Sequence, residues 1–371
     1  MKTFGNLSNT EILKRLLEDQ IIDINTPKFI FKAPKSMGKI NFSKIEGMLL
    51  GIAIGDSLGN TSESKSVRLR NTKFGLITDY LPNKHLNYKK VGFPSDDTQL
   101  SFDTLDVILT NGYLNMDNLA LIFSSHKIYG IGSTVKDFLR NYRDIGLPWY
   151  RAGVVGGSGN GALMRISPVT ISYIKNDKEN LWVDTILDTA LTHNSALAIG
   201  SSVAFIDMVW KFLGSEKLPK KDKLLDDFTS IMNKIIGDRK YEHRSHNINI
   251  SYSKNPGEFI NQAITEGFEK GMSIVDFHRK FGSGAYVLET DTIALYIILN
   301  FGDKPINAII QAVNYTRDND TNAAIIGTAV GALHGRTGLK SSWIQNLSGI
   351  TRKEDYGTIF KFIKETEAFL E

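Results

Sequence analysis

Two acidic clusters are the main candidates for chemistry in this sequence. Ser95-Asp96-Asp97-Thr98 precedes one predicted helix, and Asp318-Asn319-Asp320-Thr321 precedes another. Helix N-termini favour Asp, Ser and Thr, because their oxygens accept hydrogen bonds from free backbone amides. Capping explains one carboxylate per cluster but not two, since crowded carboxylates repel each other unless a cation lies between them. Two interpretations stay open: simple caps, or an oxygen site of the kind that Mg²⁺ and Mn²⁺ prefer.

The residue positions exclude an EF-hand calcium loop, and the composition excludes cysteine chemistry. An EF-hand loop that begins at Asp318 needs Gly at its sixth position and Glu at its twelfth, but the chain has Ala323 and Ala329 there. The sequence contains no cysteine, which excludes disulfides, thiolate zinc sites and cysteine nucleophiles. A metal in this protein must therefore bind oxygen or histidine ligands.

A glycine-rich segment, GGSGNGALMR, begins at Gly156. Glycines let backbone amides converge on an anion, as they do in phosphate-binding loops. No lysine follows at Walker spacing and no GxGxxG motif is present, so neither a P-loop nor a Rossmann fingerprint applies. For a single such loop, a flexible turn is the simpler interpretation and a phosphate site is the alternative. His193 and Glu63 are equally ambiguous alone, as a buried histidine and a surface carboxylate.

Helices are predicted to position these residues. Gly47, Gly51 and Gly55 recur every four positions, and small residues on one helical face let another backbone approach closely, which predicts a core helix from residue 44 onward. Other segments with a period near 3.6 run over residues 103–109, 186–210, 225–236, 256–269, 291–299, 306–314 and 323–334. Alternating strand patterns are rare, so the predicted class is all-α. Residues 237–255 lack a sustained period and predict a surface loop or insertion.

The first 43 residues are expected to form an N-terminal extension of a domain that covers residues 44–371. Ser8 and Glu11 have the spacing of a capping box, and an apolar stripe at helical period follows them. Residues 28–32 alternate like a strand, and Pro34 and Gly38 indicate an extended connection. The exposed apolar side chains of this extension must pack on something.

Composition and charge limit where the protein can be located in the cell and which classes of partner it can bind. The chain of 371 residues is 42% hydrophobic, enough for a sizeable core. Its 44 basic and 40 acidic residues are scattered, without a dense arginine tract, which argues against nucleic acid as a partner. The N-terminus lacks the apolar stretch of a secretory signal, and apolar runs fall short of the roughly 18 residues that a membrane span needs. We therefore expect a soluble, cytoplasmic protein that does not bind membranes.

Taken together and in order, several motifs resemble those of the ADP-ribosylglycohydrolase family, also called the dinitrogenase-reductase-activating glycohydrolase family. The matching pieces are GIAIGDSLGNTSE at Gly51, PSDDT at Pro94, GIGST at Gly130, GGSGNGALMR at Gly156, LTH at Leu191, GSGAYVLET at Gly282 and NYTRDNDTNAAIIGTAVGALHG at Asn314. They span residues 44 to about 340, in family order and with family-like spacing.

The resemblance implies a compact orthogonal helical bundle with two Mg²⁺ ions, for which Mn²⁺ could substitute, and an ADP-ribosylated protein as substrate. By position it assigns metal ligands, catalytic residues and substrate contacts. The implied metal ligands are Ser95, Asp96, Asp97, Asp318, Asp320 and Thr321, with Glu63, Asp97 and Asp320 as catalytic residues and Ser158, Gly159, Asn160, Gly161, His193 and Tyr286 as substrate-binding residues. The chain departs from the family by having Ser95 in place of the usual threonine and Thr61 in place of the usual proline. Serine keeps the ligating oxygen.

The implied reaction is hydrolysis of the bond between the ribose C1″ and an acceptor nitrogen of arginine. Similar family members give immunity to ADP-ribosylating toxins, and in some an N-terminal addition covers the toxin, so residues 1–43 are a candidate for toxin contact. Two alternatives remain. One is an immunity protein that acts by occlusion without catalysis. The other is a glycosyltransferase with a DxD motif at Asp318 to Asp320, a class that needs an α/β fold.

Overall fold

Helices dominate the computed structural model of the chain, which describes residues 4, 7–36, 38, 40–83, 86–174, 180–244, 252–352, 355 and 357–371. In chain order the elements are α1 (Asn9–Glu18), η1 (Lys28–Phe31), α2 (Phe42–Gly59), η2 (Asn60–Ser62), α3 (Val67–Phe74), α4 (Asp96–Asn111), α5 (Met116–Ser125), α6 (Ser133–Leu139), η4 (Arg140–Asp144), α7 (Trp149–Ala152), β1 (Val154–Val155), η5 (Leu163–Arg165), η6 (Ser167–Thr170), α8 (Ile171–Ile174), α9 (Leu181–Thr192), β2 (His193–Asn194), α10 (Ala196–Leu213), α11 (Lys221–Ile236), α12 (Pro256–Glu269), α13 (Ile274–Phe281), α14 (Val287–Phe301), α15 (Pro305–Tyr315), α16 (Asn319–His334), η7 (Arg336–Gly338), α17 (Ser341–Gln345) and α18 (Thr358–Leu370). Within the described residues, strand pairing is limited to β1 with β2 and a few isolated bridges. The predicted all-α class is confirmed.

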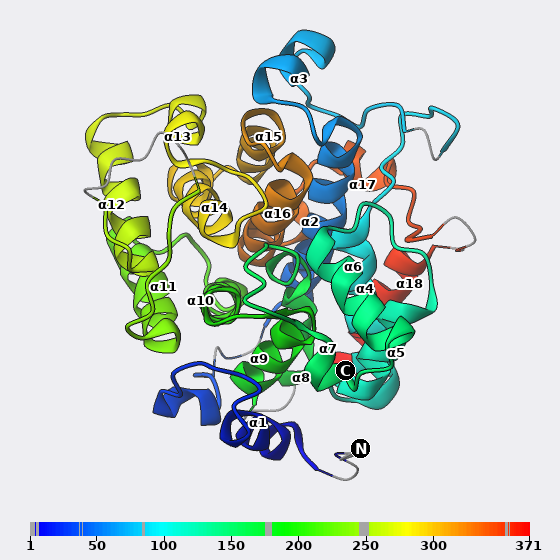
Figure 1. Cartoon of the computed structure of the whole chain (residues 1–371). Coiled ribbons are helices and arrows are strands. Elements are labelled where there is room, and N and C mark those ends of the chain that lie inside the picture. The colour runs from blue at the N-terminus through cyan, green and yellow to red at the C-terminus, as the bar shows by residue number, and fades with distance from the viewer. Residues whose placement is uncertain are drawn as a thin grey trace.

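Two central helices, α2 and α16, run antiparallel and touch through glycines (Figure 1). A Cβ atom on Gly51 would lie 2.0 Å from the carbonyl oxygen of Gly327. At the other end of the pair, a Cβ on Gly59 would lie 2.3 Å from the Cα of Asp320. Only glycine lets two helix backbones come this close. The four-residue glycine spacing is therefore the contact line between the helices, and it places the second acidic cluster beside the end of α2.

The helix predicted over residues 186–210 is interrupted, which corrects that expectation. α9 ends at Thr192, and Ser195 caps α10 by accepting a hydrogen bond from the amide of Ala198 at 3.2 Å. Apolar residues continue through the break because both helices belong to the core, so the periodicity does not reveal it.

Among the described residues, α10 is the helix long and apolar enough to cross a membrane, and 89% of it is buried inside the fold.

The N-terminal residues pack on the rest of the chain. The predicted capping box at Ser8 and Glu11 is present, and the stripe that begins at Ile12 and Leu13 is buried. Asn9 donates a hydrogen bond to Asp184 of α9 at 2.7 Å, and α1 lies beside α9 in Figure 1. The strand-like segment forms the 3₁₀ helix η1 instead, so that prediction is wrong. Its alternating apolar residues fit a tight turn because Ile30 faces the core while its neighbours are more exposed.

The predicted surface loop lies between α11 and α12. Its residues 237–244 and 252–255 contain no helix or strand, and its residues 245–251 lie outside the described part of the chain. The amide of Tyr241 donates to the carbonyl of Lys254 at 2.9 Å, which joins the two arms of the loop at its base.

Candidate active site

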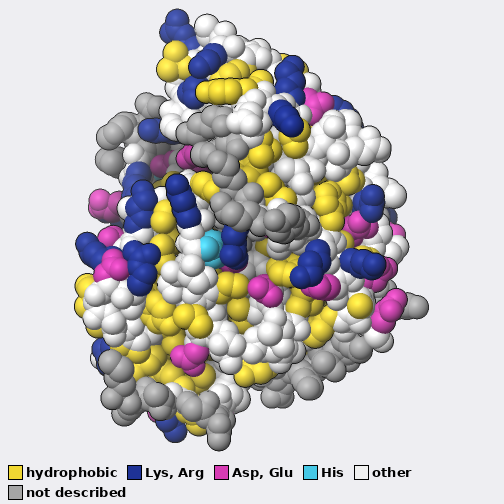
Figure 2. All heavy atoms as spheres, turned by 90° about the vertical axis from the view of Figure 1, so that its right-hand side faces the viewer, with side chains coloured by type: hydrophobic (Ala, Val, Ile, Leu, Met, Phe, Trp, Pro, Cys, Tyr) yellow, Lys and Arg dark blue, Asp and Glu magenta, His cyan; other side chains and the backbone are white. Residues whose placement is uncertain are grey.

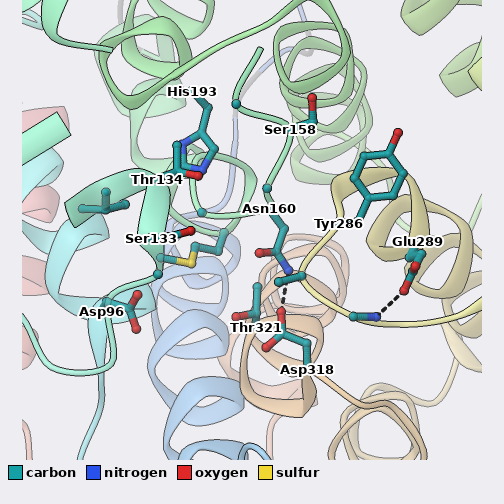
Figure 3. Close-up of a pocket in the computed structure, with 18 of the residues that line it drawn as sticks. Asp96, Ser133, Thr134, Ser158, Asn160, His193, Tyr286, Glu289, Asp318 and Thr321 are labelled. Carbon is teal, nitrogen blue, oxygen red and sulfur yellow. Dashed lines mark hydrogen bonds between the residues drawn. The ribbon is translucent and has the colours of Figure 1, made fainter. Parts of the chain in front are cut away.

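A cavity of about 740 Å³ opens at the N-terminal ends of α4, α14 and α16 (Figure 3). Its volume falls in the range of roughly 300–1,000 Å³ typical of small-molecule sites. Acidic side chains line one end, where Asp96 faces Asp318 and Thr321. The glycine-rich segment and Tyr286 line the other end. Segments far apart in sequence thus meet around one space with a polar lining.

The first acidic cluster is organised by a residue that the sequence analysis did not select, Asp56 of α2. Asp56 is fully buried and accepts hydrogen bonds from the amide and hydroxyl of Ser95 at 2.7 and 2.6 Å. It also accepts from the hydroxyl of Thr98 at 2.6 Å. Ser95 stands at the N-cap position of α4 without making a side-chain cap. The hydroxyl proton of Ser95 therefore points to Asp56, while the lone pairs of its oxygen remain for another partner.

The second cluster brings three carboxylates together. One oxygen from each of Glu63, Asp318 and Asp320 lies within 4.8 Å of the others. Asp318 occupies the N-cap position of α16 but makes no side-chain cap, and it accepts a hydrogen bond from the Asn160 amide group at 2.7 Å. Capping therefore accounts for neither Ser95 nor Asp318, and the interpretation of the clusters as simple caps is wrong at both N-cap positions.

Burial and mutual repulsion dominate the electrostatics of the clusters. Burial, then the neighbouring carboxylates, raises the pKa of Asp96, Asp97 and Asp320 well above the usual Asp range. The pKa of Glu63 is also raised, first by burial and then by Asp318 and Asp56. Buried carboxylates with such pKa values hold protons unless a cation offsets their charge. In the described part of the chain, the buried Oδ1 of Asp97 has no hydrogen-bond partner. Hard oxygen donors, crowded charge and an orphaned oxygen fit a divalent cation.

The glycine-rich segment is fastened on both sides, which is evidence against the flexible-turn interpretation. β1 pairs in parallel with β2, so the loop that follows β1 runs past His193, and a Cβ on Gly161 would lie 3.0 Å from the imidazole Cε1. On the other side, the amide of Asn160 donates to Ala285 at 2.9 Å and that of Val287 donates to Ser158 at 3.0 Å. These bonds hold the segment beside the N-terminus of α14.

Asn160, which the sequence predicts to bind substrate, also supports the second acidic cluster. Its side-chain amide donates to Asp318 and, at 3.0 Å, to Thr290, and its backbone amide is taken by Ala285. Asn160 therefore positions Asp318. The amides of Ser158, Gly159 and Gly161 have no acceptor among the described residues and remain for an anion.

His193 and Tyr286 line the cavity as neutral groups. Burial, followed by the charge of Arg165, lowers the pKa of His193 to about 3, so its imidazole is uncharged at neutral pH. Thr192 Oγ1 lies 2.8 Å from its Nδ1. Burial raises the pKa of Tyr286 to about 12. Arg165 itself is buried and pairs with Asp188, which is a structural role.

Arg244 and Glu289 also line the cavity and were missed by sequence reasoning. The guanidinium of Arg244 lies 4.2 Å from the centre of the Tyr286 ring. Glu289 accepts the amide of Gly284 at 2.7 Å (Figure 3). Arg244 lies in the loop without periodicity, where nothing in the sequence distinguishes it from other surface arginines.

Most predicted site residues line this one cavity. Those that do are Glu63, Asp96, Ser158, Gly159, Asn160, Gly161, His193, Tyr286, Asp318, Asp320 and Thr321. Ser95 and Asp97 are buried next to Asp96 and are not part of the cavity lining.

Comparison with known proteins decides the family. A sequence model described as ADP-ribosylglycohydrolase matches residues 37–367. The chain belongs to this family. Among its relatives, the ADP-ribosylarginine hydrolase Tri1 of Pseudomonas putida (strain GB-1) is 22% identical over 327 residues, which cover 82% of this chain and 74% of the relative. The ADP-ribosyl-[dinitrogen reductase] glycohydrolase of Rhodospirillum rubrum is 24% identical over 320 residues, 83% of this chain and 91% of the relative.

A solved structure supports the ADP-ribosylglycohydrolase fold. The structure of an ADP-ribosylglycohydrolase-related protein complex superposes with a TM-score of 0.63 at 20% sequence identity. The match covers 89% of this chain and 97% of that chain. The helical bundle expected from the motifs is confirmed, and the α/β fold that a DxD glycosyltransferase needs is absent from the described residues.

Proposed function

We propose that this protein is a Mg²⁺-dependent ADP-ribosylhydrolase that removes ADP-ribose from modified arginine side chains of proteins. The observation that carries the proposal is the meeting of Asp96 with Asp318 and Asp320 in one cavity, opposite a fastened glycine-rich segment. The names of two relatives, an ADP-ribosylarginine hydrolase and an ADP-ribosyl-[dinitrogen reductase] glycohydrolase, support the same chemistry.

The donor set fits the proposed metal. Side-chain oxygens of Ser95, Asp96, Asp97, Asp318, Asp320 and Thr321 would hold up to two Mg²⁺ ions, and Mn²⁺ has the same preference for hard oxygen ligands. When bound, Mg²⁺ supplies a Lewis acid that holds hydroxyl groups of the ribose and lowers the pKa of a water molecule. Asp56 keeps the start of α4 against α2, and Asn160 keeps Asp318 in place.

The protein residues bind and orient the rest of the substrate. The free amides of Ser158, Gly159 and Gly161 would bind the diphosphate, and Tyr286 and His193 would line the nucleoside and ribose sites. Binding far from the reacting bond helps orient it. In the reaction, a water oxygen forms a bond to C1″, and the electron pair of the C1″–nitrogen bond goes to the guanidine nitrogen. Glu63, whose raised pKa favours taking up a proton, is proposed to accept the proton of that water.

A second role, contact with a toxin through residues 1–43, follows from the family resemblance. The apolar face of α1 already packs inside the chain, so a toxin would have to contact its exposed face, which carries Lys14, Arg15 and Glu18. An immunity protein that only occludes a toxin, without catalysis, would have no need for crowded carboxylates in the cavity. Charge reversal of Lys14 and Arg15 tests toxin contact without disturbing the core, whereas deletion of residues 1–43 would also remove the buried Ile12 and Leu13. If residues 1–43 contact a toxin, the charge-reversed variant should lose protection against the toxin and keep its turnover of ADP-ribosylated substrate.

The decisive assay uses two peptides that carry ADP-ribose on arginine or on serine, each with Mg²⁺ and with excess EDTA. We expect release of ADP-ribose from the arginine-linked peptide, loss of release in EDTA, and recovery when Mg²⁺ or Mn²⁺ is restored. Full activity in EDTA would contradict the dependence on Mg²⁺. Release of ADP-ribose from the serine-linked peptide alone would contradict arginine as the modified residue.

A further inference from the structure

A basic, partly apolar projection stands next to the cavity. We call it the α3 arm and define it as residues 64–76. The arm contains Lys65, Arg68 and Lys73 but no acidic residue. Its side chains of Leu69 and Leu76 are 61% and 57% exposed. Figure 1 shows α3 protruding from the top of the bundle, and dark blue and yellow side chains lie together among white atoms at the top of Figure 2.

The α3 arm is held rigidly by one buried arginine. Arg70 is fully buried, and its guanidinium donates hydrogen bonds to backbone carbonyls at the end of α15, the shortest being 2.6 Å to Thr316. It also donates to the carbonyls of Lys65 and Arg317, at 3.2 and 3.1 Å. Arg317 directly precedes Asp318. The arm is thus fixed to the same stretch of chain that presents the second acidic cluster.

The arm also continues the cavity wall. Glu63 and Ser64 line the cavity, and α3 begins three residues later, at Val67. Under the proposed function, ADP-ribose enters the cavity while the protein that carries it stays outside at the rim. A rigid arm that exposes large apolar side chains between cations beside this rim has the composition of a protein-contact surface.

We propose that the α3 arm docks an acidic surface of the ADP-ribosylated substrate protein, an inference that rests on the proposed function. Lys65, Arg68 and Lys73, with no acidic residue among positions 64–76, give this part of the rim a positive charge that complements an acidic partner. Charges placed this way raise the rate of encounter and select partners of opposite charge. Leu69 adds apolar contact once the partner is docked.

The test compares three ADP-ribosylated probes with the full-length protein. Two are 20-residue peptides with ADP-ribosylarginine near one end and either glutamates or lysines towards the other. Such peptides reach roughly 65 Å when extended, and the arm begins at Ser64 in the cavity wall. The third is ADP-ribosylated agmatine, which carries no protein. The variant is Arg68→Glu with Lys73→Glu, and the matched control reverses two exposed lysines of α18, Lys361→Glu with Lys364→Glu.

We expect the unmodified protein to hydrolyse the glutamate peptide with a kcat/KM about tenfold or more above that of the lysine peptide, a preference that weakens in high salt. The arm variant should lose this preference and keep its activity on agmatine, while the control variant keeps both. Equal rates on the two peptides, or a preference that survives in the arm variant, would overturn the docking role. Failure of the unmodified protein to release ADP-ribose from agmatine and both peptides would instead overturn the proposed function.

Discussion

Replacing Gly51 by alanine should destabilise the protein through the contact between α2 and α16. The added Cβ would lie 2.0 Å from the Gly327 carbonyl oxygen, whereas ordinary contacts begin near 3.4 Å, so the helices must separate locally by about 1.4 Å. Overpacking costs about 1–3 kcal/mol, and the upper end applies because the obstacle is backbone. Alanine returns about 1 kcal/mol of helix propensity, which leaves a net loss of about 2 kcal/mol.

Thermal unfolding followed by circular dichroism measures this loss. With about 2.1 cal/mol/K of unfolding entropy per residue and 371 residues, 2 kcal/mol corresponds to a Tm lower by roughly 2–3 °C. The matched control is Gly132→Ala, since Gly132 has φ −71° and nothing within 4 Å of an added Cβ. Gly132 is the N-cap residue of α6, where alanine is less favourable than glycine, so the stability of this variant should fall by less than about 1 kcal/mol. A Gly51→Ala variant as stable as the original protein would refute the close backbone contact.

Further predictions concern the site and the core. Asp320→Asn should lower turnover by on the order of 10²-fold or more without lowering Tm, and unchanged release of ADP-ribose would contradict its role. Arg244 lines the cavity over the Tyr286 ring, where its guanidinium would offer a charged donor to the diphosphate, so Arg244→Ala should raise the KM of ADP-ribosylated substrates by about tenfold. Arg279→Ala on α13 should leave KM unchanged, and equal effects of the two substitutions would count against Arg244. Burial raises the pKa of Asp291 to about 8, so the folded state keeps a proton that unfolded Asp loses near pH 4. The stability that the protonated Asp291 contributes is present below pH 4 and is lost as pH rises to 8. Asp291→Asn should therefore make the urea midpoint depend less on pH between pH 5 and 8. Parallel pH profiles for the variant and the original protein would contradict this role of Asp291.

The helical class and much of the cavity could be predicted because their signals are local. Helical periodicity and the spacing of Gly47, Gly51 and Gly55 lie within single segments of sequence. The acidic clusters are conspicuous because paired carboxylates need an explanation wherever they occur. The break at residues 193–195 could not be predicted in this way, because α9 and α10 are both apolar and only Ser195 indicates a new helix.

The missed residues depend on contacts between distant segments. Asp56 matters because it binds Ser95, 39 positions away, and a buried aspartate inside a glycine-rich helix has no local signature. Arg244 reaches Tyr286 from a loop without periodicity. The sequence does not reveal that the side chain of Asn160 donates a hydrogen bond to Asp318, because that partner lies 158 positions further along the chain.

The most direct test of the metal site is anomalous diffraction from crystals grown with Mn²⁺. We predict manganese bound between the carboxylates of Asp96 and Asp97 on one side and those of Asp318 and Asp320 on the other, and loss of this density in the Asp320→Asn variant. An empty cavity at saturating Mn²⁺, or manganese bound only at the protein surface, would contradict the assignment of these clusters as the metal centre.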